Sequence, residues 1–384
     1  MPTLSRRDLL RATAAAPFIG RARAADPKPD APFKGMIVRM HQPRNLEMPF
    51  DALAGPNVPT EQFFVRSHFA VPAADPKAFK LVVEGHVENR LELTLDEVKK
   101  LAPVTAPLTL ECAGNGRVFL VPQARGLQWA HGGVGTADWT GTPLGALLDR
   151  AKPKAGAAHV VLVGADKGAV TADPPSPGPI HFSRSLPLAK ARKDEVLLAW
   201  GMNGDPLTPA HGAPLRAVVG GWYGCASVKW LTRVVVTDRP YAGFWQTLEY
   251  SYFVRPLGEE PETVPVTETQ PKAAVARPGP QEVVPAGKPY PVFGAAWAGE
   301  SPVAKVEVST DGGKTWAAAK IDGAPKPFTW VTWRYDWTPP SATGEALLVA
   351  RCTDAAGATQ PATRDPDRRT YMINHLVPVE VLVR

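Results

Sequence analysis

The chain has 384 residues and a mass of 41.2 kDa, more than a single compact core usually accommodates, so its size favours two domains. Hydrophobic residues make up 44% of it and charged residues 21%, which excludes a disordered protein in spite of 42 prolines and 33 glycines. That proline content is about twice the average and disfavours an all-helical bundle.

The basic charge of the chain is concentrated at its beginning. The formal net charge is +6, but residues 1–24 hold five arginines and one aspartate, and the remaining 38 basic and 36 acidic residues balance to +2. We therefore expect no nucleic-acid partner. The sequence contains no apolar run of 18 residues, so no membrane span is expected either.

Residues 1–24 have the features of a twin-arginine export signal. Residues 5–11 read SRRDLLR, a short and weakly apolar stretch follows, and residues 22–24 form an A-x-A cleavage site. The alternative is the basic start of an amphipathic helix, which would have to accommodate Pro17 and Gly20. We expect a removable signal peptide and a periplasmic protein.

Strand and helix patterns alternate from residue 33 to residue 257, which predicts an α+β domain. The predicted strands are residues 79–87, 107–111, 159–164, 195–200, 215–220 and 231–237. Thr94 and Glu97 have the spacing of a capping box, and Thr142 with Pro143 predicts an N-cap and first residue for a helix over 144–151.

Residues 258–265 read GEEPETVP and predict a linker between two domains. The remaining residues, 266–384, contain alternating runs at 303–310 and 346–353, with a turn signal at 311–313. This pattern is typical of a β-sandwich.

The three cysteines limit the possible cofactors. They stand at positions 112, 225 and 352, so the chain has no C-x-x-C or C-x-x-C-H motif, and we expect neither covalent haem nor an iron–sulfur cluster in it. One disulfide with one free thiol remains possible in an oxidising compartment.

Cys112 follows a predicted strand and opens the glycine-rich turn of ECAGNGR (111–117). A thiolate with small neighbours and Arg117 nearby suits a soft metal close to an anion. An isolated cysteine is more often a small buried hydrophobic residue, so the residues around Cys112 decide between a metal ligand and a packing residue.

Several further polar residues suit a phosphate-bearing cofactor. Arg66 and His68 share one face of an extended segment, and the glycine-rich stretch 220–224 allows a ligand to approach the backbone. Around that stretch lie four further donors, His211, Arg216, Ser227 and Lys229. Taken singly, each could instead be a solvated or structural residue.

Together the motifs ECAGNGR, FFVRSH (63–68), HGAPLR (211–216) and GWYGCASVKWLTRV (221–234) resemble the sulfite oxidase family of molybdenum enzymes. The resemblance covers about residues 33–384, because VEVSTDGGKTW (306–316) is similar to that family's immunoglobulin-like dimerisation domain. It implies a sulfite-oxidase-type molybdopterin domain followed by this immunoglobulin-like domain, and a homodimer.

The resemblance also implies a role for each site residue. Cys112 would be the protein ligand of molybdenum, beside the dithiolene of a pyranopterin. The residues implied to hold the pterin and its phosphate are His68, Asp166, His211, Arg216, Ser227, Val228 and Lys229. Arg66 and Arg117 would line the oxyanion pocket, with Trp129 close to it.

This sequence departs from the family's pattern at two positions. Trp200 occupies a catalytic position where the family usually has tyrosine, and Pro378 is the nearest match to a third anion-binding arginine. Cys225 is interpreted as a packing residue.

The leading hypothesis is oxidation of sulfite to sulfate, with electrons passed to a separate c-type cytochrome. The alternatives are a molybdenum-dependent reductase of a small S-oxide or N-oxide, and a non-enzymatic binding module.

Overall fold

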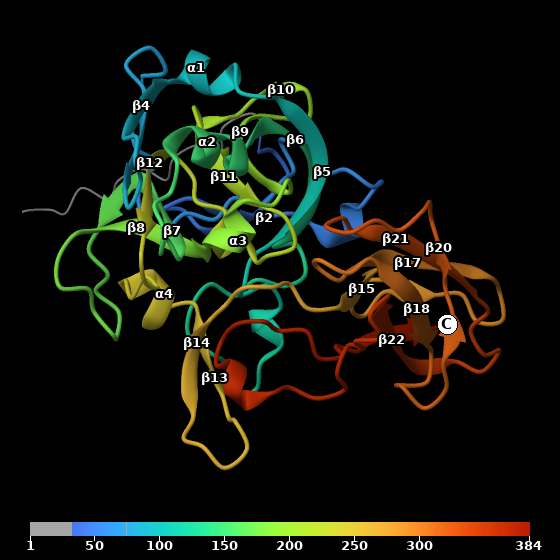
Figure 1. Cartoon of the computed structure of the whole chain (residues 1–384). Coiled ribbons are helices and arrows are strands. Elements are labelled where there is room, and N and C mark those ends of the chain that lie inside the picture. Colours follow the sequence, from blue (N-terminus) through green and yellow to red (C-terminus); the bar gives the residue numbers. More distant parts are fainter. Residues whose placement is uncertain (1–32, 74) are drawn as a thin grey trace, which may run out of the picture.

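The computed structural model describes residues 33–73 and 75–384, and this part of the chain is mostly β-structure (Figure 1). The predicted signal peptide lies outside the described residues. Within them the α-helices are short: α1 (Leu95–Lys99), α2 (Leu144–Ala151), α3 (Leu188–Ala191) and α4 (Phe244–Thr247). The expected α+β class is therefore right only in part. No described helix is long and apolar enough to cross a membrane.

Two five-stranded sheets build the first domain. One has the order β10-β9-β6-β5, with β11 also paired to β9, and the other has the order β4-β3-β12-β7-β8. The strands of the first sheet are β5 (Val104–Glu111), β6 (Val134–Pro143), β9 (Val196–Met202), β10 (Asp205–Pro206) and β11 (Arg216–Val219). Those of the second are β3 (Lys80–Gly85), β4 (Leu91–Thr94), β7 (His159–Gly168), β8 (Ile180–Pro187) and β12 (Leu231–Thr237).

All six predicted runs in this domain form strands, but four further strands of the two sheets, β4, β6, β8 and β10, were not predicted, and β6 and β8 are the longest of these. β6 reads VGTADWTGTP and is nevertheless buried along most of its length, because β5 and β9 pair with it on its two edges. β8 buries Ser183, Arg184 and Ser185. Tertiary contacts, which the local sequence does not show, make these segments strands.

The start of α1 is confirmed and that of α2 is corrected. Thr94 and Glu97 form the expected capping box at α1. Strand β6 continues through Pro143, which is itself the N-cap of α2, so Thr142 does not cap that helix. The buried hydroxyl of Thr142 instead donates to the carbonyls of Val98 and Leu101, at 2.8 and 2.7 Å, where α1 ends. Carbonyls near a helix end have few partners inside the helix, which explains this contact, although the Val98 carbonyl also accepts from the backbone N–H of Leu101 at 3.1 Å.

The segment 258–265 is only partly the irregular linker that its sequence indicates. Its second half is strand β14 (Glu262–Pro265), which pairs antiparallel with β13 (Ser251–Val254) in a projecting hairpin (Figure 1). The partner strand lies before the segment, so composition within 258–265 could not reveal the pairing. A domain boundary in this region stays a prediction.

The second domain consists of two sheets with a shared core. One sheet contains β15 (Lys272–Arg277), β17 (Tyr290–Trp297), β20 (Lys320–Ile321) and β21 (Val331–Trp337). The other contains β16 (Val283–Val284), β18 (Val303–Ser309), β19 (Ala317–Ala318), β22 (Gly344–Asp354) and β23 (Val379–Val383). Val292 and Trp333 of the first sheet belong to the same buried cluster as Val306 and Leu348 of the second. This is the expected β-sandwich.

Short elements complete the described chain. They are strands β1 (Ile37–Met40) and β2 (Asn45–Glu47), and the 3₁₀ turns Phe50–Ala52, Arg117–Phe119, Pro209–His211, Gly224–Ala226 and Pro366–Arg368.

The two domains share a buried interface along β5. Thr109 donates its backbone N–H to the carbonyl of Phe328 at 2.8 Å, and its hydroxyl accepts from the backbone N–H of Trp330 at 2.8 Å. Trp297 and Trp330 of the second domain belong to the same hydrophobic cluster as Leu110. The strand that leads into Cys112 is thus held against the second domain.

The corrected role of Thr142 can be tested with two substitutions. Thr142→Val keeps the shape of the side chain but removes the hydroxyl from the carbonyls of Val98 and Leu101. Because the Val98 carbonyl keeps the backbone N–H of Leu101 as a donor, we expect the free energy of unfolding to fall by about 1 kcal/mol. Thr142→Ser keeps the hydroxyl and is the control. Urea unfolding of the full chain measures both, and a valine variant as stable as the serine variant would contradict this role.

Candidate functional site

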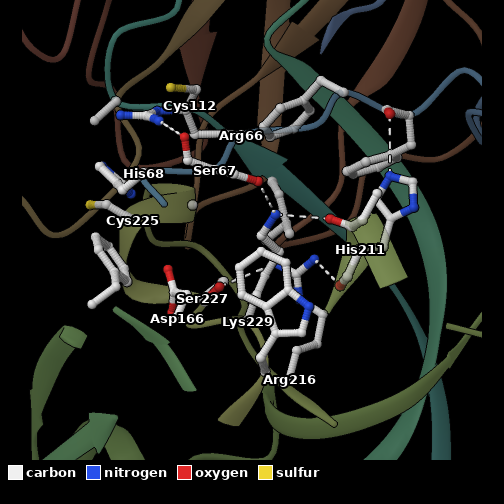
Figure 2. Close-up of a pocket in the computed structure, with 18 of the residues that line it drawn as sticks. Arg66, Ser67, His68, Cys112, Asp166, His211, Arg216, Cys225, Ser227 and Lys229 are labelled. Carbon is white, nitrogen blue, oxygen red and sulfur yellow. Dashed lines mark hydrogen bonds between the residues drawn. The ribbon is translucent and has the colours of Figure 1, made fainter. Parts of the chain in front are cut away.

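Two cavities meet beside Cys112. The inner cavity has a volume of about 650 Å³ and the outer cavity one of about 1400 Å³. The residues that line both are Arg66, Ser67, His68, Cys112 and Tyr250. Figure 2 shows the inner cavity, with Cys112 at one end and Arg216 and Lys229 at the other.

Cys112 is held at the end of β5 by its backbone. Its N–H donates to the carbonyl of Gly133 at 2.8 Å, and its own carbonyl accepts from the N–H of Asn115 at 2.8 Å. The turn that follows requires glycine: a Cβ atom on Gly114 would lie 2.3 Å from the Arg117 guanidinium, and Gly116 has a φ of +96°. Burial raises the pKa of the Cys112 thiol, while Arg66 and Arg117 lower it.

Arg216 and Lys229 place two buried cations in the inner cavity. The Arg216 guanidinium donates to the carbonyls of His211 and Ser227, at 2.9 and 3.1 Å. The Lys229 ammonium donates to the hydroxyl of Ser67 at 3.0 Å and to a backbone carbonyl at 2.8 Å. Within the described part of the chain neither cation has a carboxylate within ion-pair distance.

The electrostatics of this cavity fit an anionic group. Burial, together with the charge of Arg216, lowers the pKa of Lys229 well below its usual range, and burial lowers the pKa of Arg216 to about 9. Asp166 is the lining carboxylate, and burial raises its pKa to about 6. The folded chain thus holds positive charges that repel one another, and a bound phosphate would relieve that repulsion.

His68 and Tyr250 form a hydrogen-bonded pair where the cavities meet. The distance between Nε2 of His68 and the Tyr250 hydroxyl is 2.6 Å, and the His68 ring stacks on Phe182 with centroids 4.4 Å apart. Burial, with a smaller effect of Arg66, lowers the pKa of His68 well below its usual value, so the ring is neutral. Tyr250 has a φ of +52°, which a non-glycine residue adopts only when its surroundings hold it there.

The outer cavity is lined by further arginines. The Arg117 guanidinium donates to the hydroxyl of Thr370 at 2.6 Å and to the carbonyls of Thr370 and Leu127, both at 2.9 Å. Arg125 forms an ion pair with Glu249 at 3.1 Å. Arg66 donates to the side-chain oxygen of Asn45 at 3.2 Å and to the carbonyl of Ser67.

Most of the residues singled out from the sequence come together at these cavities. The inner cavity is lined by Arg66, His68, Cys112, Asp166, His211, Arg216, Ser227 and Lys229, and the outer cavity by Arg117. Their roles stay predictions, because position alone does not establish them.

Three other expected site residues lie away from both cavities. Trp129 is fully buried and packs edge-on against Phe64 at a centroid distance of 6.2 Å. Trp200 packs against the hydrophobic cluster between the two sheets of the first domain, and Val228 is buried inside that cluster. Pro378, the nearest match to a third arginine, is exposed in front of β23.

The structure also adds residues that the sequence did not indicate. Cys225 packs in the hydrophobic cluster as expected, but it also lines the inner cavity. Tyr250 and Tyr371 line the outer cavity. Cys112, Cys225 and Cys352 are all buried free thiols, so the disulfide that the sequence left open is not formed. Cys225 lies inside a quoted motif, whereas Tyr250 and Tyr371 carried no local signal.

The chain matches two family models. Residues 68–245 match the oxidoreductase molybdopterin binding domain, and residues 264–381 match the Mo-co oxidoreductase dimerisation domain. Among solved structures, it is similar to the crystal structure of the sulfane dehydrogenase SoxCD from Paracoccus pantotrophus, with a TM-score of 0.76 and 28% identity over 87% of this chain and 83% of that one.

Curated relatives match over nearly the whole chain. The chain is 33% identical to mitochondrial sulfite oxidase of Mus musculus, covering 94% of this chain and 68% of that protein. It is 36% identical to sulfite oxidase of Gallus gallus, covering 86% and 74% respectively. These matches, together with a buried thiol beside a cation-lined cavity, show that the chain belongs to the sulfite oxidase family of molybdopterin oxidoreductases.

Proposed function

We propose that this molybdopterin oxidoreductase oxidises sulfite to sulfate at a molybdenum centre that Cys112 would bind. We propose that it passes the electrons to a separate c-type cytochrome. The observation that carries the proposal is the position of the Cys112 thiol between two cavities. One offers buried cations for an anionic cofactor, and the other offers arginines for an oxyanion. The family relatives named sulfite oxidase support sulfite as the substrate.

The inner cavity would hold the molybdenum cofactor. Arg216 and Lys229 offer charge to its phosphate, and Ser227, His211 and Asp166 line the same cavity. The Cys112 thiolate would be the protein ligand of the metal. When bound, the cofactor supplies a two-electron redox centre and the oxygen atom that is transferred. The chain's own residues supply orientation and charge.

The outer cavity has the charge that a small oxyanion requires. Its charged lining residues are Arg66, Arg117, Arg125 and Glu249. Because Glu249 offsets Arg125, the charges of Arg66 and Arg117 remain uncompensated. Arg117 uses one donor on each terminal nitrogen to bind the protein and therefore keeps one on each, which is enough for a bidentate contact.

Tyr250 would provide the hydroxyl that position 200 lacks. Its hydroxyl lies beside His68 where the cavities meet, whereas Trp200 lines neither cavity. A phenol can donate a hydrogen bond to a substrate oxygen while it accepts one from a neutral histidine. The substitution at position 200 therefore does not remove a hydroxyl from this site.

The proposal is tested with protein made in a host that synthesises molybdopterin. We expect molybdenum in the purified protein and sulfite-dependent reduction of ferricyanide or cytochrome c. Cys112→Ser should abolish both by removing the metal ligand, while Cys352→Ser, a buried thiol in the second domain, should keep both. Reduction of methionine sulfoxide by reduced viologen without any sulfite oxidation would reject the proposed direction. Absence of molybdenum would reject the cofactor.

The raised pKa of Asp166 predicts that the stability of the cofactor-free protein depends on pH. Its pKa is raised from 3.8 to about 6 by burial, so the folded chain keeps a proton that the unfolded chain releases. The stability due to this group is present below about pH 4 and is lost as the pH rises through about 6. The neutral variant Asp166→Asn should therefore gain up to about 3 kcal/mol at pH 7 and nothing at pH 4.

Urea unfolding of the cofactor-free protein between about pH 4 and pH 7.5 measures this difference. Asp51→Asn, which changes an exposed carboxylate outside both cavities, is the matched control. An equal effect of Asp166→Asn at both ends of the pH range would contradict the buried position of this carboxylate.

The mature protein is proposed to be a periplasmic homodimer. The twin-arginine pattern supports export, and the match to a dimerisation domain supports the dimer. Protein recovered from the periplasm of a Tat-competent bacterium should begin at Ala25 and show twice the chain mass by light scattering. Replacing Arg6 and Arg7 with lysine should retain the full-length chain in the cytoplasm. A monomer mass at every concentration would reject the dimer, and export of the lysine variant would reject the route.

A further inference from the structure

The carboxylate of Glu111, directly before Cys112, is bound by the second domain. Its exposed fraction is 1%, and it accepts from the Lys272 ammonium at 3.1 Å and from the Trp297 indole N–H at 2.8 Å. Lys272 begins β15 and Trp297 ends β17, and the two residues are paired across these strands. Two donors of the second domain therefore enter the first domain side by side.

Lys272 also binds Asn115, which follows Cys112 by three residues. Its ammonium donates to the backbone carbonyl of Asn115 at 3.0 Å, and the Asn115 side chain in turn donates to Glu111 at 3.1 Å. The Asn115 side-chain oxygen accepts from the N–H of Gly133, whose carbonyl binds the N–H of Cys112. One buried cation thus connects both ends of the four-residue turn that presents the thiol.

The C-terminal segment of the second domain adds two contacts to the same stretch. The backbone N–H of Met372 donates to the carbonyl of Ala113 at 2.7 Å, and Thr370 binds the Arg117 guanidinium. The second domain therefore contacts residues on both sides of Cys112, from Glu111 to Arg117.

We propose that Lys272 is a positioning residue for the thiol of Cys112, so that the second domain shapes the molybdenum site in addition to any role in dimerisation. The charge pair with Glu111 fixes where β5 ends and where the turn begins. Loss of the ammonium leaves a buried carboxylate without its cation and frees the Asn115 carbonyl, so the turn opens locally. The proposal uses the proposed function only in taking Cys112 as the metal ligand.

The experiment measures the exposure of Cys112 in the cofactor-free full chain. Each variant is treated with iodoacetamide, and alkylation at Cys112 and Cys352 is followed by peptide mass spectrometry, with the melting temperature measured in parallel. Lys272→Met should raise the alkylation rate of Cys112 at least about tenfold while Cys352 stays protected. The double variant Glu111→Gln/Lys272→Gln restores a neutral hydrogen-bonding pair and should return the rate to near the wild-type value.

Lys190→Met is the matched control. Lys190 is also a buried lysine that joins the two domains, since it binds Glu195 and Glu300 at 2.7 Å, but it does not contact the Cys112 turn. Its replacement should leave the alkylation of Cys112 unchanged. Should Lys272→Met fail to fold, Trp297→Phe removes one donor from Glu111 while keeping an aromatic ring, and a several-fold rise at Cys112 alone is expected.

Wild-type protection of Cys112 in a folded Lys272→Met variant would overturn the proposal. The same rise in Lys190→Met would also overturn it, because that result reports general loosening. In the molybdenum-competent host, Lys272→Met should also retain less metal than Lys190→Met. If the wild-type protein bound no molybdenum, the proposed function would fail while the alkylation result would still decide the role of Lys272.

Discussion

The buried contact between Glu111 and Lys272 is the constraint on which the site depends. The carboxylate of Glu111 and the ammonium of Lys272 have exposed fractions of 1% and 2%, and each has further hydrogen-bond partners, which a buried ion pair requires. Thr109 and Glu111 stand two residues apart on β5 and therefore point to the same side, toward Trp330 and Trp297. The domains can satisfy these groups in one relative position only, and that position also sets the end of β5, where Cys112 begins.

The inner cavity differs, because its cations Arg216 and Lys229 have no carboxylate within ion-pair distance among the described residues. Arg216 and Lys229 are held by backbone carbonyls and a hydroxyl, which fix their positions without neutralising them. Such an arrangement costs folding free energy in the empty protein and favours binding of an anion. A ligand that binds only the folded state stabilises it in proportion to its affinity. A cofactor bound as proposed would therefore link its binding to the folding of this domain through the same two side chains.

The sequence could predict features whose cause is local. Runs of β-branched residues predicted six strands of the first domain, and the spacing of Thr94 and Glu97 predicted a helix cap. Both predictions rest on signals that act within a few residues. Arg66 and His68 line the same cavities, but Ser67 between them lines both cavities as well, so alternation along an extended segment does not account for their position. Thr142 was misjudged because its partner carbonyls lie in α1 and directly after its end, more than 40 residues earlier. The binding of Glu111 by the second domain spans about 160 residues of sequence, and no local pattern encodes it.

Trp200 shows that a residue can match a family position in the sequence and still lie away from the site in the structure. On β9, Val196 and Leu198 belong to the hydrophobic cluster between the two sheets, whereas Leu197 and Ala199 belong to the cluster that contains Cys112. Alternation therefore assigns Trp200 to the side away from the thiol, as the structure has it.

The hydroxyl at the junction of the cavities comes instead from Tyr250, from a residue in the left-handed backbone region. That conformation is unfavourable for tyrosine by itself, so the contacts with His68 and Tyr371 must hold it. The outer cavity is consequently lined by Tyr250 and by two arginines, Arg66 and Arg117, that have no ion-pair partner among the described residues, whereas Trp200 packs against the hydrophobic core of the first domain.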